Sequence, residues 1–137
     1  MSGAEWALQV GLRDALSADA GVKAWLGDPP RIYDEAPDDP IFPYLTFGRS
    51  ESRVLDGDDA PATEQIIHLH YWSRYGGRRE AKEGLAAVRA AVDGAAPTLD
   101  GHRLCALRPT YTDVFRAGDG RTVHGVVRLR ALTEPEI

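Results

Sequence analysis

Cysteine and long apolar runs are the scarcest features of this 137-residue chain. Its single cysteine, Cys105, excludes an intrachain disulfide and a four-cysteine zinc site. No run approaches the roughly 18 apolar residues of a membrane span. Residues 1–9 also lack the basic cluster that opens a signal peptide. We therefore expect a protein made in the bacterial cytoplasm, with no membrane partner.

Positive charge is also in short supply. The chain has 16 lysines and arginines against 21 acidic residues, which gives a net charge of −5. A protein that grips duplex DNA usually carries a basic face, because it must displace counterions from the phosphates. The acidic excess therefore argues against tight DNA binding. It is compatible with a pore through which DNA only passes.

Familiar catalytic motifs are missing as well. The chain has no Gly-x-Ser-x-Gly elbow, and the glycines at 76–77 lack the Gly-Lys-Ser/Thr ending of a phosphate-binding loop. Paired carboxylates are confined to loops, where the fixed geometry of acid–base catalysis is hard to hold. Because the predicted rigid elements carry mainly apolar and arginine side chains, we expect no enzyme, no catalytic residue and no cofactor.

Two histidines are the best candidates for binding a metal or a small ligand. His68 and His70 alternate in a predicted strand, so both side chains point to one face. A metal site needs a third and usually a fourth ligand, and neither His102, His124 nor Cys105 stands at a recognised spacing. We favour a polar or interface face of the sheet and expect no bound metal. A small metal- or ligand-binding protein that uses His68 and His70 is the alternative from another class.

Two further features have a functional and a structural interpretation. The acidic stretch that starts at Asp56 resembles a calcium loop, but Pro61 and Ile67 stand where an EF-hand needs glycine and glutamate. A solvated loop, or one that orders against a neighbouring protein, is the preferred interpretation. Cys105 has Arg103 and Arg108 nearby, which could activate a thiol. Its apolar neighbours instead predict a buried, inert side chain.

Hydrophobic periodicity predicts helices and strands in a consistent order. Helices are expected at residues 4–18, in a short turn around residues 22–26, and at 78–93. Trp6 is expected to widen the apolar stripe of the first helix. Strands are expected at residues 43–54, 63–72, 99–115 and 122–132, with a further short one at 31–33.

The strands at 43–54 and 63–72 should form a hairpin, and the last two strands should form another across the turn at 116–121. Successive hairpins rather than βαβ units indicate an α+β fold. Its sheet should be mixed and mainly antiparallel, with about four strands and helices packed on one face. The length predicts a single domain over residues 1–137.

Three segments resemble those of the small tail-completion, or tail-terminator, proteins of long-tailed phages and gene transfer agents. The first is the N-terminal amphipathic helix followed by Arg31-Ile32-Tyr33 and Pro43-Tyr44-Leu45. The second is the strand Ile66–Trp72, which ends in Trp72-Ser73-Arg74-Tyr75. The third is the following alanine- and leucine-striped helix with a late hairpin. Together they span nearly the whole chain.

This resemblance implies a structural virion protein with a sheet backed by helices. Six subunits would close a homohexameric ring at the head-proximal end of the tail tube, where the ring stops tube growth and joins tail to head. The partners would be other copies of the chain, the tail tube protein and a head-side connector or stopper protein. The free protein could be a monomer. The runner-up is another assembly protein, such as a stopper or a tail chaperone.

Ring contacts join two different patches of identical subunits. The turns at 56–61 and 116–121 carry opposite charge biases, so one or both are expected to reach a neighbouring subunit or the tube. The proline-rich loop at 34–43 is a second interface candidate, with aromatic anchors at its base. The interface residues predicted in this way are Asp56, Asp58, Asp59, Arg116, Asp119, Arg121, Tyr44 and Phe47.

Overall fold

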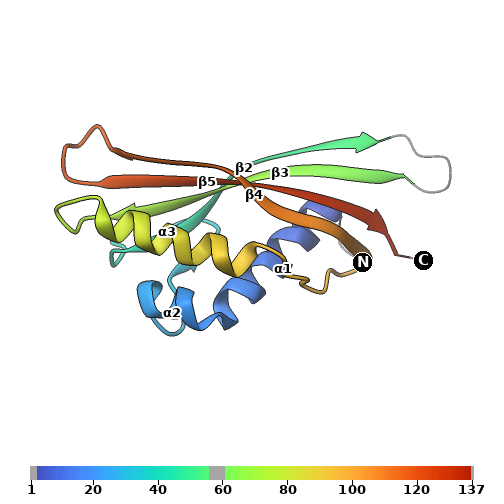
Figure 1. Cartoon of the computed structure of the whole chain (residues 1–137), viewed down its shortest axis with the longest axis horizontal. Coiled ribbons are helices and arrows are strands. Elements are labelled where there is room, and N and C mark those ends of the chain that lie inside the picture. Colours follow the sequence, from blue (N-terminus) through green and yellow to red (C-terminus); the bar gives the residue numbers. More distant parts are fainter. Residues whose placement is uncertain (1–2, 56–60, 137) are drawn as a thin grey trace.

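The chain folds into helices that pack on one face of a sheet (Figure 1). The computed structural model describes residues 3–55 and 61–136. The helices are α1 (Ala4–Ala18), α2 (Ala20–Leu26) and α3 (Arg79–Val92). The strands are β1 (Ile32–Tyr33), β2 (Tyr44–Leu55), β3 (Ala62–Ser73), β4 (His102–Arg116) and β5 (Val123–Pro135). The predicted α+β fold is confirmed. In the described residues the sheet has five strands rather than about four, because the short β1 joins it.

The strand order in the sheet is β1-β2-β3-β5-β4. Both predicted hairpins form, β2–β3 and β4–β5. They join through β3 and β5, which pair antiparallel from Thr63↔Thr133 to Ser73↔Val123. β1 is parallel to β2, so the sheet is mixed but mainly antiparallel. Helix α3 connects the two hairpins across the covered face, which brings strands from both halves of the sequence side by side.

Local sequence signals set the boundaries of α1 and α2. Asp19 separates the two helices, and its carboxylate accepts a hydrogen bond of 3.0 Å from the backbone N–H of Val22. A carboxylate at this position satisfies one of the donors that a helix start leaves unpaired. Helix α2 ends at Gly27, whose φ of 93° suits a residue without a Cβ. The chain therefore changes direction between α1 and α2, beneath the sheet.

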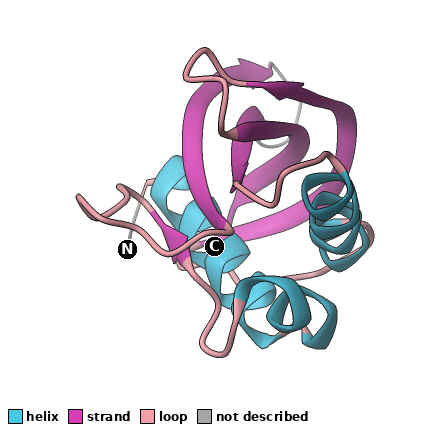
Figure 2. Ribbon diagram, turned by 90° about the vertical axis from the view of Figure 1, so that its left-hand side faces the viewer, coloured by secondary structure: helices cyan, strands magenta, loops and turns pink. Residues whose placement is uncertain are grey.

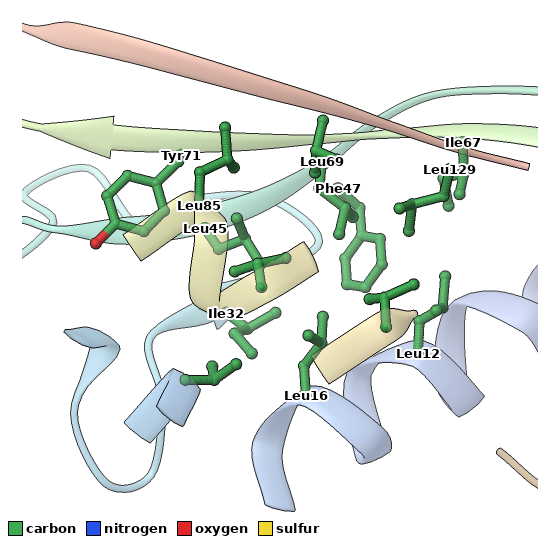
Figure 3. Packing of buried hydrophobic residues seen from close by; sticks show 14 of the residues in the cluster. Leu12, Leu16, Ile32, Leu45, Phe47, Ile67, Leu69, Tyr71, Leu85 and Leu129 are labelled. Atoms are coloured by element: carbon green, nitrogen blue, oxygen red, sulfur yellow. The ribbon is translucent and has the colours of Figure 1, made fainter. Parts of the chain in front are cut away.

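The core lies between the sheet and the helices (Figure 3). The predicted stripe of α1 is buried at Leu8, Leu12 and Leu16, and that of α3 is buried at its expected positions. Trp6 does not widen the α1 stripe as expected, because its side chain is 54% exposed. Two positions along a helix correspond to a rotation of about 200°, so Trp6 lies almost opposite Leu8.

The other face of the sheet, called the open face below, is not covered by the helices (Figure 2). As predicted, Ile67, Leu69 and Tyr71 of β3 are buried, whereas the residues between them are only half-buried. Strand β5 alternates in the same way. Figure 1 also shows that both hairpins extend past the ends of the helices. Within the described residues, no helix has the length and apolarity needed to cross a membrane.

Cys105 corrects one prediction, because it is exposed rather than buried. It lies in β4, an edge strand of the sheet, and most residues of this strand are exposed. The pairing of β4 with β5 shifts between Leu104 and Ala106, and Cys105 is left out of the register. Such an irregularity redirects a side chain. Apolar neighbours in sequence therefore did not make this position an interior one.

Candidate assembly surface

An aromatic row crosses the open face of the sheet. The register aligns Tyr44 of β2 with Trp72 of β3, Trp72 with His124 of β5, and His124 with Phe115 of β4. Directly paired residues point to the same face of a sheet. The four rings therefore form one line across the four long strands.

The rings in this row contact one another. The centroids of Trp72 and His124 lie 4.0 Å apart with nearly parallel planes, and those of Phe115 and His124 lie 4.9 Å apart. The Trp72 indole N–H donates a hydrogen bond to the hydroxyl of Thr46 at 3.0 Å. Phe115, at the β4 end, is 40% exposed. The row therefore offers a rigid, amphipathic surface, which is the kind of anchor that protein interfaces use.

A pair of histidines lies next to this row. Nδ1 of His70 is 2.7 Å from Nε2 of His124, so one ring donates a hydrogen bond to the other. Burial, helped by the neighbouring His70, lowers the pKa of His124 to about 4. Burial also lowers the pKa of His70. Both rings are therefore neutral near pH 7. In such a neutral pair, the N–H of one ring donates to the unprotonated nitrogen of the other.

His68 lies on the same face but has different partners. Its Nδ1 is 3.3 Å from the backbone oxygen of Arg49, and Nε of Arg128 donates to its Nε2 at 3.4 Å. His68 and His70 line an open depression of about 530 Å³ together with arginine side chains. The described residues contain no group of three or more histidines, cysteines and acids that could hold a metal. The two predicted histidines thus share a face, but His70 is directed to His124.

Charged side chains occupy the part of the open face near the end of β2 and the start of β3. Glu64 accepts hydrogen bonds from Arg130 at 2.8 Å and from Arg53 at 2.9 Å. The hydrogen bond from Arg130 is the main reason that the pKa of Glu64 is lowered. Farther along, the Arg128 guanidinium lies 4.6 Å above the centre of the Tyr111 ring. These contacts tie the central strands to both flanking strands.

The predicted turn at 116–121 forms a hairpin tip held by Asp119. This carboxylate accepts bonds from the backbone N–H of Thr122 at 2.8 Å, from its hydroxyl at 2.7 Å, and from the N–H of Arg121 at 2.9 Å. These bonds, led by the Thr122 hydroxyl, lower the pKa of Asp119 strongly. Asp119 therefore orders the tip. Arg116 and Arg121 are exposed on it.

The aromatic residues predicted at the base of the 34–43 loop are both covered by other parts of the subunit. Tyr44 is 8% exposed and Phe47 is 9% exposed. Phe47 belongs to the core, whereas Tyr44 is covered by the rings of Tyr33 and Phe42 at 6.1 and 5.1 Å. Neither side chain is therefore an exposed aromatic anchor within the single subunit, and their part in an interface stays a prediction. Ile41, which is 68% exposed, is the apolar residue that this loop presents.

The remaining predicted interface residues, Asp56, Asp58 and Asp59, lie outside the described residues. Prediction from the sequence missed the aromatic row, since Trp72, His124 and Phe115 were not among the expected interface residues. A signal was present, because alternation placed Trp72 and His124 on the open sides of their strands. Aligning them required the β3–β5 pairing, which places Trp72 opposite His124, 52 positions further along the sequence.

Comparisons with known proteins agree with this architecture. The family described as Tail completion protein gp17 matches residues 10–134. Among solved structures, a chain of the "Virion of native gene transfer agent (GTA) particle" is 25% identical to this chain. That match covers 97% of this chain and 99% of the other, with a TM-score of 0.87. No curated protein matches the chain. Since the family match covers most of the sequence, this chain belongs to the tail completion protein gp17 family.

Proposed function

We propose that the chain is a structural subunit of a ring at the head-proximal end of a phage-like tail tube. The ring ends tube growth and joins the tail to the head. The observation that carries this proposal is the shared fold with a chain of a gene transfer agent virion, which extends over nearly the full length of both chains. A match confined to a common substructure would not support a shared place in a particle.

The features of the surface suit an assembly role. The open face carries a line of rings and arginine-linked charges, and both hairpins extend past the helices (Figure 1). Rigid aromatic anchors with a polar rim are typical of protein interfaces. The chain acts as one domain, residues 1–137, and contributes no catalytic group. Its partners are further copies of itself, closing a homohexamer, with the tube protein on one side and the head-side connector on the other.

DNA passes through the lumen of this ring without being held. The net charge of −5 fits that task, because weak attraction leaves DNA free to move. The ring's place is in the virion after synthesis in the bacterial cytoplasm. Free subunits wait as monomers until the finished tube offers a template.

Deletion of the gene in a bacterium that produces the particles tests this role. We expect electron micrographs of particles without the chain to show tails of uncontrolled length that carry no heads. Supplying the gene in trans should restore normal particles. Detached tails of normal length would assign the chain to the head side of the joint instead. Intact particles in the deletion strain would refute the proposal.

A further inference from the structure

Both outer edges of the sheet have long unpaired stretches in the described residues. β5 is the one strand that pairs with β4 in the described residues, apart from a single bridge between Leu99 and His102, and β2 pairs with β1 only at Leu45 and Thr46. An edge strand presents backbone N–H and C=O groups that a strand of another chain can bind. The two edges belong to different strands. They can therefore meet only when one copy of the chain lies beside another.

Irregularities in the pairing confine the regular part of each edge to one short segment. The register of β4 shifts at Leu104/Ala106 and at Pro109/Tyr111, which leaves Tyr111–Arg116. The register of β2 shifts between Phe47 and Ser50, which leaves Ser50–Leu55. The two segments have the same length. They carry exposed apolar side chains, namely Val54 (66% exposed), Tyr111 (46%) and Phe115 (40%).

We propose that Tyr111–Arg116 of one subunit pairs antiparallel with Ser50–Leu55 of the next, so that the sheet continues from subunit to subunit around the ring. This inference rests on the ring role proposed above. A closed ring requires two different patches to meet at each joint, and two different edges satisfy that requirement.

Strand direction favours an antiparallel joint. The strands β2, β3, β5 and β4 alternate in direction, so β4 runs opposite to β2. A rotation about an axis roughly along the strands leaves their directions unchanged. β4 of one subunit and β2 of the next then run antiparallel, as the three pairs of long strands within a subunit do. This alternation of strand directions is the same for any number of subunits.

Side-chain direction and charge favour one register. Asp113 and Arg53 both belong to the open face, since they pair with Val126 and Glu64 respectively. Paired residues must share a face, and pairing Asp113 with Arg53 satisfies this while placing opposite charges together. Both residues are exposed, and the Arg53 side chain is 72% exposed. A slip by two residues in one direction would instead place Asp113 opposite Glu51, which opposes like charges.

The same register places Tyr111 opposite Leu55 and Phe115 opposite Glu51. The aromatic row of one subunit would therefore end at the side chains of the next subunit. The exposed part of Phe115 would be covered at this joint. The exposed Val54 would lie opposite Thr112, on the other face of the joint. The edge thus gains backbone pairing together with the burial of apolar surface.

Engineered disulfides in assembled particles test the pairing. In a Cys105→Ser background, the variant with Arg53→Cys and Asp113→Cys is oxidised with oxidised glutathione and run on a non-reducing gel. Directly opposite residues have the Cα separation that a disulfide needs. We expect a ladder of cross-linked chains that ends at the closed ring. The control variant pairs Asp113→Cys with Glu51→Cys. These positions are diagonal in the proposed register and should give no ladder.

Charge reversal provides a second readout that does not depend on cysteines. Arg53→Asp and Asp113→Arg should each lower the yield of complete particles at least tenfold, and the double variant should recover most of it. Particles that contain the ring but show no ladder at 53/113, or an equal ladder at 51/113, would overturn the edge pairing alone. Particles in which the unaltered chain is absent from the head-proximal tail end would overturn the ring role as well.

Discussion

His70 and His124 share a hydrogen bond of 2.7 Å between Nδ1 and Nε2, across the junction of the two hairpins. They come from β3 and β5, so this contact links the first half of the sequence to its last strand. The Trp72 ring stacks on His124 at 4.0 Å and covers the pair from one side. The result is a neutral, half-buried polar contact in the middle of the open face.

This histidine pair predicts that acid weakens the fold. The pKa of His124 is lowered to about 4 by burial and then by His70, whereas an unfolded histidine titrates near 6.5. Below pH 6.5 the unfolded chain binds a proton that the folded chain does not bind. The free energy of unfolding should therefore fall as the pH drops from about 6.5 to about 4. Because solvent screens a half-buried ring, we expect a loss of about 1 kcal/mol from this group.

Denaturant unfolding at several pH values, followed by circular dichroism, measures this loss. The His124→Gln variant lacks the titrating ring, so its stability should decline less than that of the unaltered chain between pH 6.5 and 4.5. The acidic residues are present in both chains and serve as the common background. Parallel curves for the two chains would contradict the assignment.

Gly84 of α3 is predicted to resist replacement by alanine. A Cβ at this position would lie 2.1 Å from the hydroxyl of Tyr71 and 2.3 Å from the ring carbon that bears it. Tyr71 is fully buried, so its ring has little space to move into. Glycine to alanine normally stabilises a helix by up to about 1 kcal/mol. Here we expect Gly84→Ala to lower the free energy of unfolding by about 1–3 kcal/mol, because the core becomes overpacked.

Gly77 offers a matched control, since nothing lies within 4 Å of a Cβ built there. Gly77→Ala should leave the unfolding midpoint close to that of the unaltered chain. Equal stability of the two alanine variants would show that α3 can shift away from the sheet. The contact between Gly84 and Tyr71 would then not determine how closely the helix packs.

The Tyr71 hydroxyl gives an independent prediction. It is buried without a hydrogen-bond partner in the described residues, and burial raises the pKa of this phenol. Removing an unpaired buried hydroxyl takes away a desolvation cost. Tyr71→Phe should therefore leave the free energy of unfolding unchanged or raise it by up to about 1 kcal/mol. A loss of more than 1 kcal/mol would reveal a partner for this oxygen.

The hairpin tip at 116–121 remains a predicted contact with a neighbouring subunit or the tube. Arg116→Glu together with Arg121→Glu should reduce particle assembly while leaving the fold intact. Asp119 holds the tip through Thr122 and through the backbone of residue 121, and the two substitutions preserve these bonds. Rim charges mainly guide register and rate of association. Particle yield and the circular dichroism spectrum are the two measurements.

Arg13→Glu together with Arg79→Glu is the matched control, because both positions are exposed and the charge change is the same. This control should assemble normally. Normal particles from the variant at the hairpin tip would refute its role as a contact. Equal defects in both variants would point to the total charge of the subunit instead.

Local sequence patterns predicted most of the secondary structure. The stripe of α3 and the alternation of β3 specify one buried side each, since only one side of these elements is apolar. Both hairpins followed from strands joined by short turns. The same reasoning failed at Cys105, where an irregular edge strand turns a residue with apolar neighbours outward. Local patterns also did not reveal that neighbouring rings cover Tyr44 or that Phe47 packs into the core.

The sequence alone determined the element order, the apolar face of each element and the absence of familiar catalytic motifs, because these depend on neighbours a few residues apart. Only the tertiary structure decided that β5 lies between β3 and β4. That placement aligns Trp72 with His124 and leaves the regular segments of β2 and β4 at opposite edges of the sheet. Such pairings join distant residues, and no local pattern encodes them, since the energy of a strand pair depends on side chains of both strands.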